Sequence, residues 1–167
     1  MEFKNYFKHR WPPALFALLC LPLFAQSSGY LTVGEIPKVA GQRNAAVKAK
    51  IPVTIKDGYH INSSTPSDEY LIPLKVTWKS TGALEGGQVV YPKPTVEKFE
   101  FQQPNEKPLS IYSGSFEIVV NFKVAGNAQA GPGVAVGQLR YQACSNKACY
   151  PPKNIDITVP YQVQPGS

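Results

Sequence analysis

Phe116-Glu-Ile-Val-Val-Asn-Phe-Lys-Val124 sets the fold class of this 167-residue chain. Its apolar residues recur at every second position from end to end, and polar side chains stand between them at Glu117, Asn121 and Lys123. Successive side chains of a β-strand point to opposite faces of the sheet, so this period predicts a strand with one buried face.

The same alternation recurs in the segments 47–55, 72–78 and 155–161, and shorter strands are expected near 89–91 and 137–143. Turn-forming residues separate these runs, at 56–58, 63–66, 80–82, 86–87, 126–127 and 131–133. The 16 prolines and 13 glycines also oppose long helices. We therefore predict an all-β, immunoglobulin-like β-sandwich that forms a single domain. Residues 26–45 carry little pattern and are expected to be an extended lead-in.

The N-terminus is typical of a secretory signal peptide over residues 1–27. Lys4, Lys8 and Arg10 precede an apolar run at 14–25 that is short for a membrane span. Cleavage would remove Cys20 and leave a domain at 28–163 with a short tail at 164–167. The alternative is an uncleaved N-terminal anchor. Export to the periplasm fits a chain that carries a disulfide.

The charge of the chain argues against a nucleic-acid partner. The formal net charge of +6 falls to +4 once residues 1–25 are removed, with 14 basic against 10 acidic residues remaining. The remaining lysines are scattered rather than clustered, so no nucleic-acid footprint is present. Beyond the signal peptide no segment is long and apolar enough to cross a membrane.

A second informative segment is Tyr141-Gln-Ala-Cys144-Ser-Asn-Lys-Ala-Cys149-Tyr150-Pro-Pro152. After export, its cysteines are the only two left, and an oxidising compartment favours a disulfide between them. Closing a loop of about six residues stabilises a fold by only about 2 kcal/mol. The short spacing therefore favours a functional disulfide, although a short structural staple stays open.

This segment closely resembles the end of the N-terminal periplasmic domain of the DsbD family of thiol:disulfide interchange proteins. Lys56-Asp-Gly-Tyr59-His60-Ile-Asn62 resembles the segment of that domain whose aromatic residues flank the cysteines. Both motifs occur in the same order on an all-β chain, and the resemblance covers roughly residues 30–163.

The resemblance implies an immunoglobulin-like sandwich whose cysteine pair is reduced by a thioredoxin-like partner and then reduces other periplasmic proteins. Carried over to this chain, Cys149 forms the mixed disulfides and Cys144 resolves them. The family also caps its disulfide with an aromatic residue on a loop, and Phe99 or Phe101 is the candidate here. Because this chain has neither the membrane domain nor the thioredoxin-like domain usual in the family, we expect a separate protein to supply its electrons.

Other residues could belong to the same site. Tyr59, Tyr141 and Tyr150 could line it, or simply pack in the sandwich. His60 could tune proton transfer near the thiols. Two cysteines and one histidine make an incomplete zinc set, so neither a metal nor another cofactor is expected.

Two competing readings stay open beside an interchange activity, which requires a redox-active pair. The chain could be a secreted β-sandwich binding module whose disulfide is a structural staple. It could also be a redox-inactive descendant that still docks a thioredoxin-fold partner.

Overall fold

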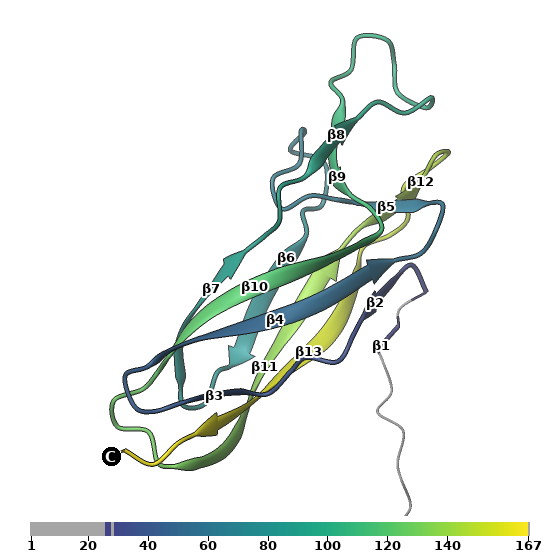
Figure 1. Ribbon diagram of the computed structural model, residues 1–167. Coiled ribbons are helices and arrows are strands. Elements are labelled where there is room, and N and C mark those ends of the chain that lie inside the picture. Colours follow the sequence, from purple (N-terminus) through teal and green to yellow (C-terminus); the bar gives the residue numbers. More distant parts are fainter. Residues whose placement is uncertain (1–25, 28, 167) are drawn as a thin grey trace, which may run out of the picture.

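The computed structural model describes residues 26–27 and 29–166 (Figure 1). Within them the regular structure consists of strands, and no segment is a helix able to span a membrane. Cys20 and nearly all of the predicted signal peptide lie outside the described residues, so cleavage and export stay predictions.

Two sheets pack face to face as a sandwich (Figure 1). In spatial order the first contains β1 (Gln26–Ser27), β2 (Leu31–Val33), β4 (Ala46–Ile55), β10 (Ser115–Val124) and β7 (Leu84–Val90). The second contains β3 (Val39–Gly41), β13 (Lys153–Val163), β11 (Gly131–Tyr141) and β6 (Lys75–Ser80). A third sheet extends one end of the sandwich and contains β12 (Ala143–Ser145), β5 (Tyr59–Asn62), β9 (Leu109–Tyr112) and β8 (Thr95–Glu97).

The core lies between the two large sheets and follows the predicted alternation. In β10, the residues Ile118, Val120, Phe122 and Val124 are all buried. They belong to one apolar cluster with every second residue of β4 from Val47, every second residue of β13 from Ile155, and Ala135, Leu139 and Tyr141 of β11. The prediction of an all-β, immunoglobulin-like sandwich is confirmed. Such a sandwich presents its strand ends and loops at its two ends, and one of these ends carries the third sheet and the cysteines.

Two of the predicted turns are wrong. Gly86 and Gly87 lie inside β7, where their φ angles of 89° and 78° accompany a shift in register against β10. A Cβ on Gly87 would lie 2.8 Å from the indole nitrogen of Trp78, so the glycine allows that ring to pack over the bulge. The segment 131–133 likewise belongs to β11 rather than to a turn.

The N-terminal segment is more ordered than the predicted lead-in. Its residues form β1, β2 and β3, and β3 pairs in parallel with β13 in the opposite sheet from β2. The run predicted at 72–78 is strand only from Lys75, where β6 begins. Leu74 is buried in the core just before it.

Candidate functional site

The two cysteines face each other across a hairpin that extends the β11–β13 pair. Tyr141 at the end of β11 pairs with Lys153 at the start of β13, and the segment between them folds back on itself. Backbone N–H groups of Ser145 and Tyr150 donate to the carbonyls of Ala148 and Ala143, at 2.9 and 2.8 Å. These bonds flank the position where Cys144 opposes Cys149. Opposed residues in such a non-hydrogen-bonded pair approach most closely, and here the two form a disulfide with their Cα atoms 3.9 Å apart.

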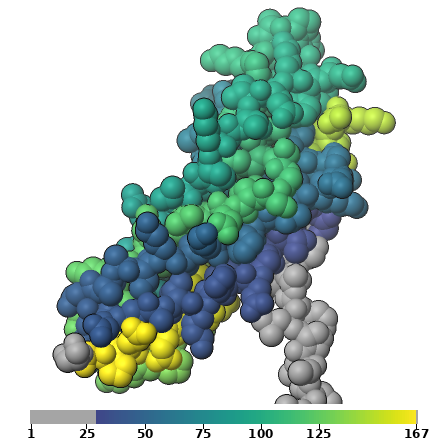
Figure 2. Space-filling model, in the orientation of Figure 1, coloured from purple at the N-terminus to yellow at the C-terminus, as the bar shows by residue number. Residues whose placement is uncertain are grey.

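The two sulfur-bearing residues differ sharply in exposure. Cys144 is 0% exposed and belongs to β12, whereas Cys149 is solvent-exposed and follows the hairpin tip. Pro151 and Pro152 separate Cys149 from the start of β13. The hairpin projects from the upper end of the molecule, in yellow-green in Figure 2. An incoming sulfur can therefore reach Cys149 but not Cys144.

Gln142 ties the hairpin to the body of the protein. Its side-chain oxygen accepts from the Asn62 amide at 3.0 Å and from the backbone N–H of Ile72 at 3.3 Å. Its amide nitrogen donates to the carbonyl of Tyr150 at 3.2 Å. The Gln142 side chain thus holds both the segment that precedes Cys144 and the segment that follows Cys149.

His60 lies opposite the buried cysteine on the neighbouring strand. It pairs directly with Cys144 across the β5–β12 ladder, and it is only 3% exposed. Directly opposed residues of an antiparallel pair point to the same face of the sheet. The Nε2 atom of His60 is buried without a hydrogen-bond partner among the described residues. Burial lowers the pKa of His60 below its ordinary value, so the imidazole is neutral near pH 7.

An aromatic stack covers His60. The rings of His60 and Phe99 are nearly parallel, with centroids 4.1 Å apart, and Phe101 continues the stack at 5.6 Å from Phe99. Phe99 is half-buried and Phe101 is exposed. The structure thus brings both predicted cap candidates to the site, with Phe99 above the imidazole.

The loop that carries these phenylalanines, residues 98–108, is held together by its own bonds. The Gln102 side chain accepts from the backbone N–H of Phe99 and donates to the Lys107 carbonyl, at 3.0 and 2.8 Å. The Lys98 amine donates to the carbonyl of Pro104 at 2.6 Å. All of these partners lie within the loop, which stands at the end of the sandwich beside the hairpin (Figure 1). Such a loop can move as a unit if its stack on His60 breaks.

Three tyrosines form a second aromatic cluster next to the hairpin. Tyr30 lies 4.8 Å from both Tyr59 and Tyr150, and Tyr59 and Tyr150 are 6.0 Å apart, measured between ring centroids. The ammonium of Lys153 sits over the Tyr30 ring at 4.9 Å. The nearby Tyr150 hydroxyl raises the pKa of Tyr59, so its phenol stays neutral at physiological pH.

A cavity of about 400 Å³ opens beside Cys149. Its apolar wall includes Leu71, Leu109, Phe101 and the 84% exposed Tyr70. Ser67, Asp68, Gln102, Glu106 and Lys107 also line it. The exposed cysteine therefore borders a hollow large enough to accept a side chain of a docking protein.

The predicted site residues come together with one exception. Tyr59, His60, Phe99, Phe101 and Tyr150 surround the hairpin as described above, whereas Tyr141 is 0% exposed within the core. Sequence reasoning missed Tyr30 because it stands outside every periodic segment. It also missed Gln142, whose place two residues before Cys144 was the available signal. The roles of all these residues stay predictions.

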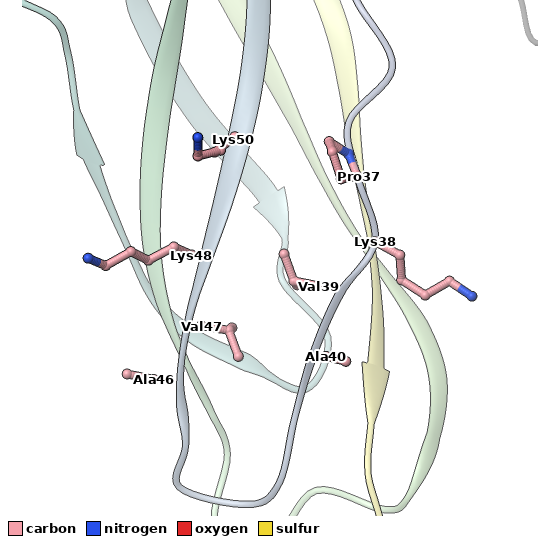
Figure 3. Close-up of a pocket in the computed structure, with 8 residues that line it drawn as sticks. All are labelled: Pro37, Lys38, Val39, Ala40, Ala46, Val47, Lys48 and Lys50. Atoms are coloured by element: carbon pink, nitrogen blue, oxygen red, sulfur yellow. The ribbon is translucent and has the colours of Figure 1, made fainter.

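Another cavity, of about 350 Å³, lies between β3 and β4 (Figure 3). Lys38 and Lys48 line it but extend in opposite directions, and Lys50 is paired with Glu117 at 3.0 Å. These cations do not converge on one point and form no anion site. In the described part of the chain no group of three His, Cys, Asp or Glu residues could hold a metal ion.

Comparisons with known proteins give a family and a fold. The sequence model of the family described as "Thiol:disulfide interchange protein DsbD, N-terminal" matches residues 29–160. The N-terminal periplasmic domain of ScsB from Proteus mirabilis is 14% identical in sequence, with a TM-score of 0.56. That match covers 78% of this chain and 46% of the ScsB chain, so this chain spans about half the length of that structure.

The reduced N-terminal domain of DsbD from Neisseria meningitidis is 23% identical, with a TM-score of 0.41. That match covers 77% of this chain and 90% of the other. No curated protein sequence matches the chain.

Proposed function

The chain belongs to the family of the N-terminal domain of the thiol:disulfide interchange protein DsbD, and we propose on this premise that it is a periplasmic thiol–disulfide exchange protein. It passes reducing equivalents between thioredoxin-like partners through Cys144 and Cys149. Export by a signal peptide over residues 1–27 would place it in the compartment where its partners work.

The observation that carries this proposal is the unequal exposure of the two sulfur-bearing residues. Exchange requires one sulfur that a partner can attack and a second thiol that releases the partner from the mixed disulfide. Cys149 is exposed and borders a cavity, and Cys144 is buried directly opposite it. A staple needs no such asymmetry.

The exchange runs in two steps. A donor thiolate attacks Cys149 Sγ, the Cys144–Cys149 bond breaks, and Cys144 leaves as a thiolate that is then protonated. The second donor thiol resolves the mixed disulfide, which leaves both cysteines reduced and the donor oxidised. In the forward direction Cys149 attacks the disulfide of an acceptor, and Cys144 then attacks Cys149 Sγ and frees the reduced acceptor.

The test is the reduction potential of the pair, measured by equilibration against glutathione and dithiothreitol buffers. A value between about −180 and −280 mV would place the protein among working exchange proteins. A value well below about −300 mV would contradict the proposal, because structural disulfides lie in that range. The protein would then be a binding module with a structural disulfide.

A further inference from the structure

We propose that His60 accepts the proton of Cys144 when Cys144 attacks the mixed disulfide at Cys149. This inference rests on the proposed function and adds a residue to its chemistry. The geometry behind it is the direct pairing of His60 with Cys144 between β5 and β12, which turns both side chains to one face.

The chemistry requires a base at this position. Cys144 must become a thiolate before it can attack, because the thiolate and not the thiol is the nucleophile. Cys144 is 0% exposed, so bulk water cannot take the proton of its thiol directly. Burial also disfavours the charged thiolate. A neighbouring group that takes the proton as the S–S bond forms lets Cys144 react without first becoming a free buried thiolate.

The unpaired Nε2 of His60 fits this role. Buried polar atoms nearly always have a hydrogen-bond partner, so an exception needs a cause. Across the described residues, two buried side-chain atoms lack one: His60 Nε2 and Asn62 Oδ1. Of these two residues, only His60 pairs with Cys144. In the oxidised protein the Cys144 sulfur carries no proton to share, whereas the reduced thiol supplies one. We therefore attribute the missing hydrogen-bond partner of His60 Nε2 to the Cys144 thiol, which exists only in the reduced protein.

The surroundings keep the imidazole neutral and available. From β12 it meets Cys144, from the 98–108 loop it meets Phe99, and Tyr59 precedes it on its own strand. The charged residues on either side of Phe99, Lys98 and Glu100, are both solvent-exposed, and the Lys98 amine bonds the Pro104 carbonyl. Burial is the cause that lowers the pKa of His60, so its lone pair is free near pH 7.

The step balances without a further reagent. In the mixed disulfide, Cys149 is bonded to the acceptor and Cys144 is a thiol. The Cys144 proton moves to Nε2 as Cys144 Sγ bonds to Cys149 Sγ and the acceptor sulfur leaves as a thiolate. The imidazolium then returns the proton to solvent or to the leaving thiolate. In the reverse direction, a donor displaces the Cys144 thiolate, and His60 takes a proton from solvent and passes it to that thiolate.

The two sulfurs can be followed separately in the full chain carrying Cys20→Ser, so that only the pair reacts. The chemically reduced protein is mixed with dithiobis(nitrobenzoic acid), an aromatic disulfide that releases a coloured thiolate twice. The first phase is attack by exposed Cys149 and depends on reagent concentration. The second is attack by Cys144 on the mixed disulfide and does not.

We expect His60→Gln to slow the second phase by about 10²-fold at pH 7, the low end for general base catalysis, and to spare the first phase. The wild-type second phase should be nearly flat between about pH 6.5 and 8, because neutral His60 takes the proton. In His60→Gln it should rise about tenfold per pH unit with the thiolate fraction. The matched control Val96→Ala truncates a 67% exposed residue of β8, keeps the imidazole and its stack, and should keep the flat profile.

A second phase in His60→Gln with the wild-type rate and pH profile would overturn the inference. If His60→Gln does not fold, the imidazole can be titrated by NMR in the wild-type fold, with His9→Gln leaving His60 as the one histidine. Its pKa should change on reduction of the pair, and identical titrations in both redox states would also overturn the inference. Failure of the proposed function would appear separately, as a reduction potential outside the exchange range.

Discussion

The rings of His60 and Phe99 lie nearly parallel, with centroids 4.1 Å apart and planes inclined by 16°. His60 belongs to the strand that pairs with the buried cysteine, and Phe99 belongs to a loop whose hydrogen bonds are internal. This stack therefore links the loop to β5, the strand that pairs with the cysteine hairpin. It holds Phe99 of that loop against the imidazole.

Phe99→Ala should speed reduction of the disulfide by a small phosphine about two- to tenfold. An aromatic pair contributes about 0.5–1.5 kcal/mol, so its loss raises the population of an open loop by about that factor. Stopped-flow measurement of phosphine reduction tests this. The control is Val96→Ala, which truncates a 67% exposed residue of β8 and leaves the stack in place. Equal rates in both variants and wild type would show that Phe99 does not limit access.

The sequence predicted the sandwich because burial with period 2 is a local property that each strand carries by itself. It misplaced Gly86 and Gly87 because a glycine pair is typical of a turn, and only packing against Trp78 and β10 makes it a bulge. The disulfide could also be predicted, because its two cysteines are only five positions apart in the sequence. The stack of Phe99 on His60 was not predicted, since it joins residues far apart in the chain whose contact depends on the folded third sheet.

Cys144→Ser should trap partners, whereas Cys149→Ser should not. In the first variant the exposed Cys149 can form a mixed disulfide that no second thiol resolves. In the second variant the remaining cysteine is 0% exposed and should give at least about tenfold less adduct, because reactivity follows access. Both variants carry Cys20→Ser and are incubated with a thioredoxin-like protein whose resolving cysteine is replaced by serine and whose remaining cysteine is activated as a mixed disulfide with thionitrobenzoate. Intact-mass measurement counts the adducts, and comparable yields would contradict the assigned roles.

Gln142→Ala should destabilise the oxidised protein by about 1 kcal/mol, the cost of leaving part-buried polar groups without partners. The groups affected are the backbone N–H of Ile72 and the carbonyl of Tyr150, with the Asn62 amide losing one of its two bonds. Urea unfolding measures the change. Gln138→Ala is the matched control on β11, because it removes an exposed bond to Asp156 and should change stability by less than about 0.5 kcal/mol. Equal effects would mean that Gln142 does not brace the hairpin.

Acid should destabilise the oxidised protein through His60. Burial lowers the pKa of this imidazole in the folded state, so below its ordinary value of 6.5 the unfolded chain binds a proton that the folded protein does not. The free energy of unfolding is therefore at its full value above about pH 6.5 and falls with decreasing pH until the folded-state pKa is passed. One proton limits the slope to about 1.4 kcal/mol per pH unit.

Urea unfolding between about pH 5 and 7 measures this slope in wild type and in His60→Gln. This pH range lies above the titration of Asp156. The Lys79 ammonium lowers the pKa of Asp156 from 3.8, so any stability that this carboxylate contributes is lost only at lower pH. His60→Gln should remove most of the slope because glutamine does not titrate. A slope that persists unchanged in the variant would assign the acid sensitivity to another group, and would mean that the imidazole takes up its proton as readily in the fold as in the unfolded chain.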